Sequence, residues 1–313
     1  MNALPSVSVI IVSYSVRDLL RRCLESVRTQ QGVTVETWVV DNASPDGSAD
    51  MVASEFPEAR LIRNAENVGF ARANNQALRQ AMGEILLLLN PDTELSPRAL
   101  AVLPEVFARH PRAGAVGLAL RNLDGSPQPS CHAFPGVWNQ ALESLGLRGP
   151  SLALGIGTPM AAPVPRGGEG EVDWVSGACM AISRAARNRV GGLEESLFLY
   201  GEEMDWSWRA RAVGFTTVYS NAATVMHHVG ASGVGLRGPL FVHNLQARLW
   251  FLRRHRGAWR AALARELIVL GSWLRLIHWR ARARAEGAQP APHTRDQLER
   301  FQAVLDWRRG GRS

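Results

Sequence analysis

The first 90 residues alternate between short apolar runs and segments whose apolar residues recur at helical spacing. Two runs of strand length are strongly apolar, VSVIIVSY at residues 7–14 and EILLLL at residues 84–89. Shorter apolar runs occupy residues 34–40 and 61–63, and helical spacing extends over residues 69–82. Strands that are apolar on both faces and alternate with helices are typical of a parallel sheet covered on two sides. The sequence therefore predicts an α/β fold, a mostly parallel sheet flanked by helices, in the order β-α-β-α-β-α-β.

Polar residues stand where each of these predicted strands ends. They are Ser13 and Tyr14, Asp41, Asn64, and Asp92. In open parallel sheets, ligands bind in the crevice beyond the carboxyl ends of the strands. We therefore expect these side chains, which are far apart in the sequence, to meet at one crevice.

The chain after the fourth strand predicts three further features. Ser96 is in position to cap a helix over residues 97–110, and residues 115–120 form a strand. Residues 121–172 contain 7 Pro and 9 Gly, which predicts a long irregular segment of the kind that often forms a mobile functional loop. Regular structure returns over residues 173–183.

Helical spacing dominates the C-terminal part, over residues 241–255 and 263–284. One apolar stripe in the second segment is formed by Leu263, Leu267, Leu270, Leu274 and Ile277. Arg flanks this stripe, and the region carries five of the ten Trp residues. An amphipathic helix of this composition fits residence at an anionic membrane surface, but packing of the stripe against the rest of the protein is the commoner arrangement. Both interpretations stay open.

Charge divides the 313-residue chain into two parts. Residues 1–235 hold 19 Arg and 23 acidic residues, whereas residues 236–313 hold 16 Arg and 5 acidic residues, within a net charge of +7. We therefore expect a catalytic domain over residues 1–235 and a basic amphipathic helical extension over residues 236–313.

Composition excludes several kinds of chemistry. The chain contains no Lys, which removes Schiff-base catalysis and the phosphate-binding Lys of a Walker A loop. Its three Cys residues, Cys23, Cys131 and Cys179, form no Cys-x-x-Cys pair, which fits a reducing cytoplasm. Neither a signal peptide nor a membrane-spanning run is indicated, so we expect a cytoplasmic protein.

Five acidic residues are candidates for metal binding or catalysis, and each also has an ordinary structural explanation. Asp92 is placed to bind Mg²⁺ or Mn²⁺ together with substrate phosphates. An Asp that follows Asn-Pro is also common in turns, so a purely structural role is the alternative for Asp92. The same alternative holds for Asp41. Glu202, Glu203 and Asp205 crowd three carboxylates beside Trp residues, which suits a general base. The same cluster also suits the acidic first turn of a helix.

Two further groups are candidates for ligand binding. His227 and His228 follow a short apolar run, and because neighbouring side chains on a strand point to opposite faces, at most one of them enters a site. Gly69, Arg72 and Asn75 begin a helix where an Arg, amides and backbone donors fit a diphosphate. An amide-rich helix start is the structural alternative.

Taken together, these residues resemble the inverting glycosyltransferases of family 2, with the GT-A fold, and especially their bacterial rhamnosyltransferase-like branch. The matching strings are VSVIIVSY, VDNASPDGS, NAENVGFARANNQAL, LLLLNPDTEL, VDWVSGACMAI, LFLYGEEMDWSWRARAVGF and ATVMHHVGAS. They follow one another in the family's order over about residues 7–232.

The resemblance implies a nucleotide-sugar donor and assigns residues to it. Tyr14 is expected to stack on the base, Asp41 to accept from the base or ribose, and Arg72 to contact the nucleotide. With Ser13 and Asn75, and with Asp92 at the diphosphate, these form the expected nucleotide-sugar site.

The resemblance also implies a divalent metal, Mg²⁺ or Mn²⁺, and a catalytic base. Asp92 resembles the metal-binding carboxylate and His227 an additional metal ligand. Glu203 takes the place of the catalytic base, which removes a proton from the acceptor hydroxyl in a single displacement that inverts the anomeric carbon. Three positions depart from the common family pattern: Ser15 in place of Asn, Asn90 in place of the first Asp of Asp-x-Asp, and Glu203 in place of Asp.

The expected function is transfer of a sugar, rhamnose being one candidate, from a dTDP- or UDP-activated donor to a saccharide or polyprenyl-linked saccharide in cell-envelope polysaccharide synthesis. Many relatives use lipid-linked acceptors, which fits peripheral association with an anionic membrane. A second interpretation is an inactive GT-A-like protein whose Arg-rich tail binds phosphates or nucleic acid. No nucleic-acid recognition motif is found, so no nucleic-acid partner is expected. A dehydrogenase is disfavoured because G-x-G-x-x-G does not follow the first strand.

Overall fold

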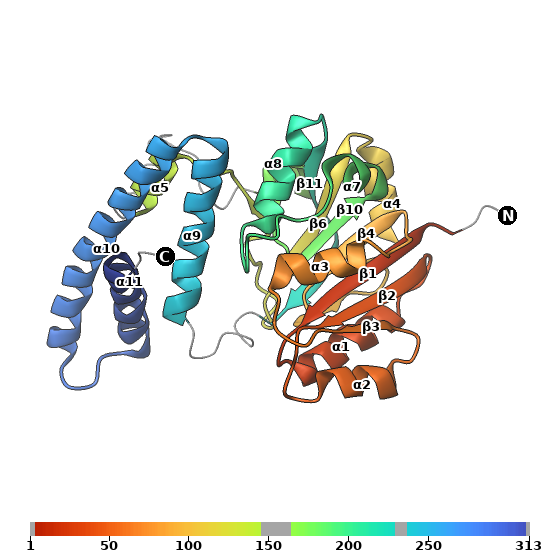
Figure 1. Cartoon of the computed structure of the whole chain (residues 1–313), viewed down its shortest axis with the longest axis horizontal. Helices are drawn as coiled ribbons and strands as arrows, with labels where there is room; N and C mark the ends of the chain where they lie inside the picture. The colour runs from red at the N-terminus through yellow and green to blue at the C-terminus, as the bar shows by residue number, and fades with distance from the viewer. Residues whose placement is uncertain (1–3, 145–163, 229–236, 311–313) are drawn as a thin grey trace. The chain divides into compact units, whose positions relative to one another are not determined.

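The computed structural model describes residues 4–144, 164–228 and 237–310 (Figure 1). These residues divide into two compact units. The sheet unit is drawn from residues 1–133 and 161–232, and the helical unit from residues 134–160 and 233–313.

The first half of the sheet unit follows the predicted alternation of strands and helices. Its elements are β1 (Ser6–Ser13), α1 (Arg17–Arg28), β2 (Thr34–Asp41), α2 (Ser48–Glu55), β3 (Arg60–Arg63), α3 (Phe70–Leu78) and β4 (Ile85–Leu89). The four strands pair in parallel in the order β3-β2-β1-β4. The predicted fold class is confirmed, because β-α units of this kind form a parallel sheet.

The second half of the sheet mixes strand directions. Its elements are β5 (Thr93–Leu95), α4 (Val102–Arg109), β6 (Ala113–Arg121), β8 (Glu169–Val172), β10 (Cys179–Ser183), α7 (Arg184–Val190), α8 (Glu202–Ala212) and β11 (Thr216–His227). β10 lies antiparallel between β4 and β6, and β11 runs parallel to β6. The order continues β4-β10-β6-β11-β5, with β8 also on β11. Because β10 is antiparallel to β4, its first residue lies beside the last residue of β4.

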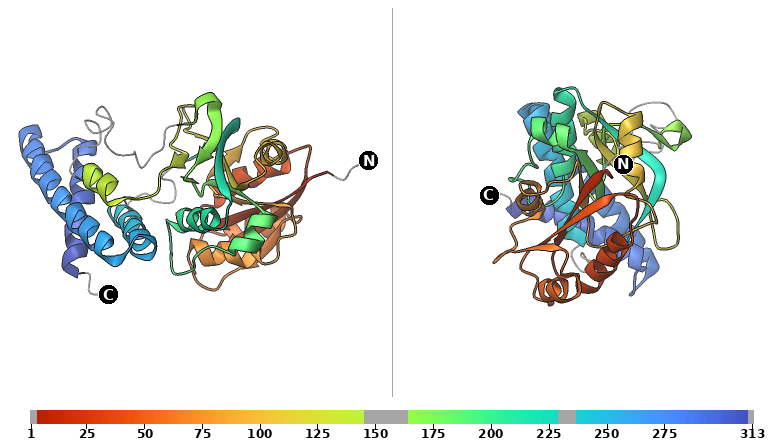
Figure 2. Two further views of the ribbon diagram at one scale, coloured as in Figure 1. Left: turned by 90° about the horizontal axis from the view of Figure 1, so that it is seen from above. Right: turned by 90° about the vertical axis from the view of Figure 1, so that its right-hand side faces the viewer.

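Helices cover both faces of this sheet (Figures 1 and 2). Alternate residues of β1 enter different apolar layers: Val9 and Ile11 pack with α1, α2 and α4, whereas Ile10 and Val12 pack with α3, α7 and α8. Burial on both faces explains why the central strands read as continuous apolar runs rather than as an apolar–polar alternation.

The helix expected over residues 97–110 starts later than predicted. α4 begins at Val102, and Arg98 has a φ of 64°, which is incompatible with a right-handed helix at that point. Ser96 does not cap the helix, because its hydroxyl accepts from the backbone N–H of Thr224 at 3.3 Å. Pro97 therefore opens a turn.

The prediction of irregular structure throughout residues 121–172 is wrong for part of that stretch. It contains β7 (Cys131–His132), which pairs with β9 (Trp174–Val175), then α5 (Val137–Ser144), a short 3-10 turn η1 (Arg166–Gly168), and β8. Residues 145–163 of the expected mobile loop lie outside the described residues. Short elements joined by Pro and Gly escape detection because none is long enough to show a period.

The helical unit consists of α5 with α9 (Arg237–His255), α10 (Ala258–Glu286) and α11 (Pro292–Gly310). Leu245 of α9, Ile268 of α10 and Val304 of α11 form its main apolar cluster. α5 also packs on α10. Besides the residues after the expected boundary at 235, this unit takes in α5 (Val137–Ser144) from the middle of the chain.

The apolar stripe predicted on α10 faces outward. Leu263, Leu270, Leu274 and Ile277 are exposed, whereas the packed side of the helix carries mostly small residues. These side chains are not covered within the helical unit, and both expected arrangements, residence at a membrane surface and packing against the rest of the protein, stay predictions. Within the described chain, none of the helices combines the length and the apolar character needed to cross a membrane.

Candidate active site

The carboxyl ends of the first strands lie level with one another. Ser13 at the end of β1 is opposite Asp41 at the end of β2, and Asp41 is opposite Arg63 at the end of β3. On the other side of β1, Ile11 is opposite Leu89, the last residue of β4. The polar residues expected to share a crevice therefore do follow one edge of the sheet.

Ser13 and Asp41 are buried with polar atoms that lack partners. Ser13 Oγ and Asp41 Oδ1 have no hydrogen bond among the described residues, although Asp41 Oδ2 accepts from the backbone N–H of Ser44 at 3.0 Å. Buried polar atoms are nearly always satisfied in folded proteins, so such a pair marks a place where a ligand completes the hydrogen bonding. The neighbouring Tyr14 is 49% exposed, which leaves its ring available for stacking.

The loops after β1 and β2 are tied to each other. The backbone N–H of Ser15 donates to Ser44 Oγ at 3.1 Å, and that of Arg17 donates to Asp46 Oδ2 at 2.9 Å. Ser15 and Ala43 both adopt positive φ, 55° and 64°. Backbone strain of this kind persists only where the surroundings enforce it and is common at binding sites.

Amide side chains form a network beside Asp41 that sequence reasoning missed. Asn42 donates to Asn67 Oδ1 at 3.1 Å and accepts from Asn64 at 2.8 Å, while Asn64 and Gln76 exchange two further hydrogen bonds. Only Asn64 was singled out in advance, from its place at a strand end. The signal for the others was the clustering of Asn near positions where strands meet helices.

Two residues expected at the nucleotide make other contacts in the structure. Arg72 is exposed and lies 3.5 Å from Glu195 Oε2. The Asn75 amide donates to Leu193 O and Glu195 Oε1 and accepts from the backbone N–H of Leu193, each at 2.9 Å. These bonds hold α3 to the segment before α8, and a nucleotide contact by either residue stays a prediction.

Asp92 and His227 lie side by side. His227 ends β11, where it pairs with Thr93 of β5, and its Nε2 is 3.3 Å from Asp92 Oδ1. His227 Nδ1 is 3.0 Å from Gln128 Oε1, while Gln128 Nε2 donates to His227 O at 2.7 Å. Because Gln128 Oε1 can only accept, Nδ1 is the donor in this hydrogen bond, and Nε2 is the ring nitrogen that faces Asp92. Gln128 was missed because it lies in the Pro- and Gly-rich stretch, far from the recognised motifs.

The Asp92–His227 pair fits two positions of a divalent-metal shell. Neighbouring ligands of an octahedral Mg²⁺ at about 2.1 Å are about 3.0 Å apart, close to the observed separation. No group of three His, Cys, Asp or Glu side chains suited to a metal occurs among the described residues. Mg²⁺ and Mn²⁺ usually take the rest of their ligands from water and substrate phosphates, so two protein ligands suffice at such a site.

His228 points elsewhere. Its Nε2 lies 2.8 Å from Glu94 Oε1, and Glu94 also lies 3.2 Å from Arg22. The two adjacent histidines thus contact different carboxylates, as the alternation of side chains along a strand requires.

Glu203 comes to the same edge through β10. Cys179 of β10 is opposite Leu89 of β4, and the backbone N–H of Asn90 donates to Ala178 O at 3.0 Å, so the turn before β10 adjoins Asn90. A Cβ at Gly177 in this turn would stand 3.7 Å from Glu203 Cδ. The Glu203 carboxylate therefore lies within van der Waals range of the Gly177 turn, next to the segment that carries Asp92.

Burial sets the protonation of the adjacent glutamates. Burial and the charge of Glu203 raise the pKa of Glu202 well above its usual range. Burial raises the pKa of Glu203 to about 6, against the effect of backbone N–H groups at Glu203, Gly201 and Gly177 that favour the ionised form. Glu203 Oε2 and Glu202 Oε2 both have no partner among the described residues.

Tyr200 links the acidic groups. Burial and then the charges of Glu202, Glu203 and Asp92 raise the pKa of its phenol, so all three carboxylates act on one ring. Its φ of 71° and the φ of 93° at Gly201 turn the chain into α8. Sequence reasoning missed Tyr200 because positive φ at a non-glycine residue leaves no sequence pattern.

Asp205, the third carboxylate of the cluster, holds the fold together. Its Oδ2 lies 2.7 Å from Arg209 Nε, and Arg209 donates to Val190 O and Gly192 O at 2.8 Å. Asp205 is buried in this ion pair and is therefore structural, whereas Glu202 and Glu203 begin α8.

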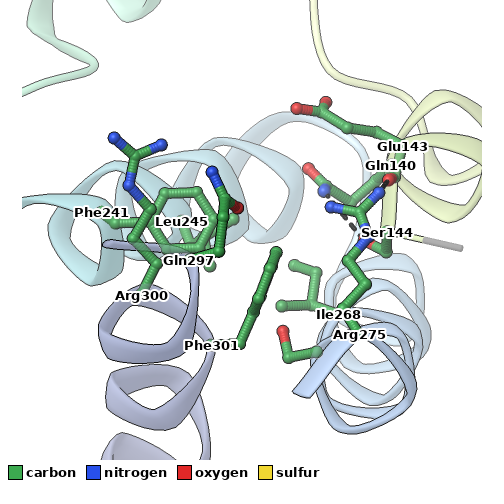
Figure 3. A pocket seen from close by; sticks show the side chains of 11 residues that line it. Gln140, Glu143, Ser144, Phe241, Leu245, Ile268, Arg275, Gln297, Arg300 and Phe301 are labelled. Atoms are coloured by element: carbon green, nitrogen blue, oxygen red, sulfur yellow. Dashed lines mark hydrogen bonds between the residues drawn. The ribbon is translucent and has the colours of Figure 1, made fainter. Parts of the chain in front are cut away.

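One cavity lies away from this edge, within the helical unit. It measures about 120 Å³, and Figure 3 shows that its lining side chains come from α5, α9, α10 and α11. Arg275 lines it but donates to Glu143 O and lies 5.4 Å from the centre of the Phe301 ring. The other lining guanidinium, Arg300, is paired with Asp296 at 3.0 Å. Both guanidinium groups that line the cavity therefore already have partners within the protein.

The sheet order, with a parallel first half and the antiparallel β10 between β4 and β6, is that of the GT-A fold. Among solved structures, a mannosyltransferase from Pyrobaculum calidifontis, in complex with GDP-Man and Mn²⁺, matches with a TM-score of 0.61 and 20% identity, over 100% of this chain and 89% of that one. The profile of glycosyl transferase family 2 matches residues 8–149.

Curated relatives extend the match to most of the chain. The N-acetylglucosaminyl-diphospho-decaprenol L-rhamnosyltransferase of Mycobacterium tuberculosis is 30% identical over 269 residues, which cover 82% of this chain and 87% of that protein. An O-antigen biosynthesis protein of Myxococcus xanthus is 29% identical over 73% of this chain and 18% of that protein. The chain belongs to glycosyl transferase family 2, and the predicted family is confirmed.

Proposed function

We propose that the protein is an inverting glycosyltransferase that uses a dTDP- or UDP-activated sugar, with rhamnose as the first candidate. The observation that carries the proposal is Glu203. It is a buried carboxylate with a free oxygen and a pKa of about 6, and it adjoins the segment that carries Asp92. A base with a pKa near the working pH, held in a water-poor site, is what proton removal from a hydroxyl needs.

The donor's nucleoside lies at the ends of β1 and β2 in this proposal. Ser13 Oγ and Asp41 Oδ1 supply an unused donor and acceptor for the base or ribose, and the exposed Tyr14 ring stacks on the base. Arg72 is the proposed cation at the nucleotide, where it exchanges its exposed pairing with Glu195 for the ligand.

In this proposal Asp92 and His227 would hold a divalent cation together with the donor's diphosphate. When bound, such a cation neutralises charge that develops on the leaving diphosphate. Gln128 orients the His227 ring by its bond to Nδ1. Glu203 Oε2 takes the proton from the hydroxyl group of the acceptor. At the same time the hydroxyl oxygen bonds to the anomeric carbon, and the bond between that carbon and the diphosphate oxygen breaks. Attack opposite the leaving group inverts the carbon.

The acceptor is proposed to be a saccharide or a polyprenyl-linked saccharide in cell-envelope polysaccharide synthesis. The support is the name of the Mycobacterium tuberculosis relative, whose acceptor is a diphospho-decaprenol glycolipid. The proposal places the enzyme on the cytoplasmic side, at the membrane that carries such an acceptor.

A donor panel tests this function. The protein is incubated with dTDP- and UDP-sugars, with Mn²⁺ or Mg²⁺, and with soluble and lipid-linked acceptors. We expect release of nucleoside diphosphate from one donor and an acceptor product heavier by one sugar, detected by mass spectrometry. Nucleotide binding without turnover for every donor, together with salt-sensitive binding to DNA, would instead support an inactive relative with a phosphate-binding tail.

A further inference from the structure

Helix α10 carries large apolar side chains on the side that faces away from its bundle. Six of them are exposed by 44 to 63%: Trp259, Leu263, Leu270, Trp273, Leu274 and Ile277. Apart from Trp273 at the margin, they recur at spacings of three, four or seven residues, so they lie along one face of the helix. At 1.5 Å per residue this face extends over roughly 27 Å.

The opposite side of α10 is the one that packs in the helical unit. Its buried residues include Ala261, Ala264, Ile268 and Leu276, and α5, α9 and α11 lie against this helix. A helix that is apolar on two opposite faces is normally buried on both. Within the helical unit the exposed face, which we call the α10 outer face, therefore lacks the cover that its composition suits.

Most of the charges along α10 are positive. The helix has six Arg and two acidic residues, Glu266 and Glu286, although Arg275 lines the cavity of the helical unit and Arg282 is paired with Glu286 at 2.8 Å. Glu266 is paired with Arg265 and Arg308, so its charge is neutralised. Arg260 lies 4.6 Å from the centre of the Trp259 ring, at one end of the face.

From this arrangement we propose that the α10 outer face docks on an anionic lipid surface, with its Leu, Ile and Trp side chains in the headgroup boundary and its Arg side chains at the lipid phosphates. An apolar face with Trp and flanking Arg has the chemistry of an interfacial helix. A second copy of the chain would bring the same Arg-rich surface against itself, which charge repulsion opposes. The inference extends the proposed function, in which the acceptor is held in such a surface.

Vesicle flotation of the full chain tests the proposal. Two vesicle types are used, phosphatidylcholine alone and a mixture with one quarter phosphatidylglycerol. The variant combines Leu270→Ser with Leu274→Ser, and the control combines Met82→Ser with Leu123→Ser, which are apolar and even more exposed positions of the sheet unit. Circular dichroism verifies that both variants are folded.

We expect the unaltered chain to float with the anionic vesicles and far less with neutral ones. The α10 variant should lose at least tenfold in partition coefficient, because two Leu side chains no longer enter the lipid, and the control should stay within twofold. Equal flotation of the α10 variant and the unaltered chain would overturn the proposal. So would a dimer in solution that the α10 variant dissociates while vesicles retain nothing.

One more measurement tests the proposed enzymatic reaction independently of the proposed docking on vesicles. Release of nucleoside diphosphate in vesicle-free solution with a soluble acceptor is expected to be the same in the α10 variant and in the unaltered chain. If the unaltered chain binds vesicles but releases no nucleoside diphosphate from any donor, the docking surface stands and the proposed reaction fails.

Discussion

The polar residues at and around the candidate site are of two kinds. Some use their polar atoms to hold the fold together, and others keep a buried polar atom without a partner. Asp205 and Asn75 use their polar atoms within the protein, whereas Ser13, Asp41 and Glu203 each keep one buried oxygen without a partner. Residue type alone does not reveal this difference. Among these residues, the pattern of strand ends predicted only Ser13 and Asp41 at the crevice, whereas Asn75 was expected from a helix start and Glu203 from the family resemblance. The partners of Asn75 lie more than 100 residues away in the chain.

The sharpest prediction at this scale concerns Glu203. Glu203→Gln keeps the shape but cannot accept a proton, so sugar transfer should fall by about 10²–10⁴-fold. Nucleotide binding, measured by calorimetry, should be unchanged. Glu105→Gln on the exposed surface of α4 is the matched control and should keep full turnover. Near-normal turnover in the Glu203 variant would remove it from the role of base.

The raised pKa of Glu203 also links pH to stability. Because the folded pKa of about 6 lies above the ordinary 4.5, the wild-type contribution is complete below pH 4.5 and is lost as pH rises through 6. Glu203→Gln avoids this loss and should raise the free energy of unfolding at pH 8 by about 2 kcal/mol, with a smaller gain at pH 5. Urea unfolding at the two pH values measures it, and an equal gain at both would contradict the assignment.

Gln128 is a positioning residue for His227. Gln128→Leu leaves the imidazole without its Nδ1 partner, so the Mn²⁺ concentration for half-maximal activity should rise by about 10- to 100-fold while activity at saturating metal recovers. His228→Ala, in the adjacent residue that contacts Glu94, is the control and should leave the metal dependence unchanged. If the Gln128 variant needs the same Mn²⁺ concentration for half-maximal activity as the unaltered chain, Gln128 does not position a metal ligand.

Among the elements, the antiparallel strand β10 matters most for the site. The β-α alternation up to β4 was predictable because each strand is apolar and each helix amphipathic. β10 is equally apolar, but its direction and its place between β4 and β6 depend on pairing with strands far away in the sequence. The position of β10 brings the Gly177 turn to Glu203. The motifs could therefore be recognised in the sequence, whereas their arrangement in space could not.

A glycine in β6 supports this arrangement. A Cβ at Gly117 would stand 2.5 Å from Val175 Cβ, in the strand that leads into the Gly177 turn. Gly117→Ala should therefore lower the free energy of unfolding by about 1–3 kcal/mol and reduce turnover as the turn shifts. Urea unfolding and kinetic assays measure both effects. Gly136→Ala, where a Cβ meets only one atom at 3.9 Å, is the control. Unaltered stability of the Gly117 variant would show that Val175 moves aside freely.

For the whole molecule, charge anticipated the division better than hydrophobicity did. The basic C-terminal segment is indeed the bulk of the helical unit, but α5 comes from a stretch that looked irregular and joins it from the middle of the chain. α11 has only Thr294, Phe301 and Val304 buried, too few apolar contacts to mark it in the sequence.

This division makes a prediction about truncation. A chain ending at residue 232 keeps α5 but loses α10, which covers it, and should be poorly soluble. Replacing residues 134–160 by a Gly/Ser linker of the same length should restore a soluble sheet unit. Size-exclusion chromatography of the two truncated chains decides the matter, and equal solubility would show that α5 does not need α10.

The place of α5 in the chain also bears on how the protein is made. The sequence between Ser144 and Arg237, which includes three strands of the nine-stranded sheet, β8, β10 and β11, is synthesised before α9 begins. At 5–20 residues per second this takes about 5–20 s, during which α5 has none of its final helical neighbours. The helical unit is thus the last part of the molecule to fold, although one of its helices is among the earlier ones to emerge from the ribosome.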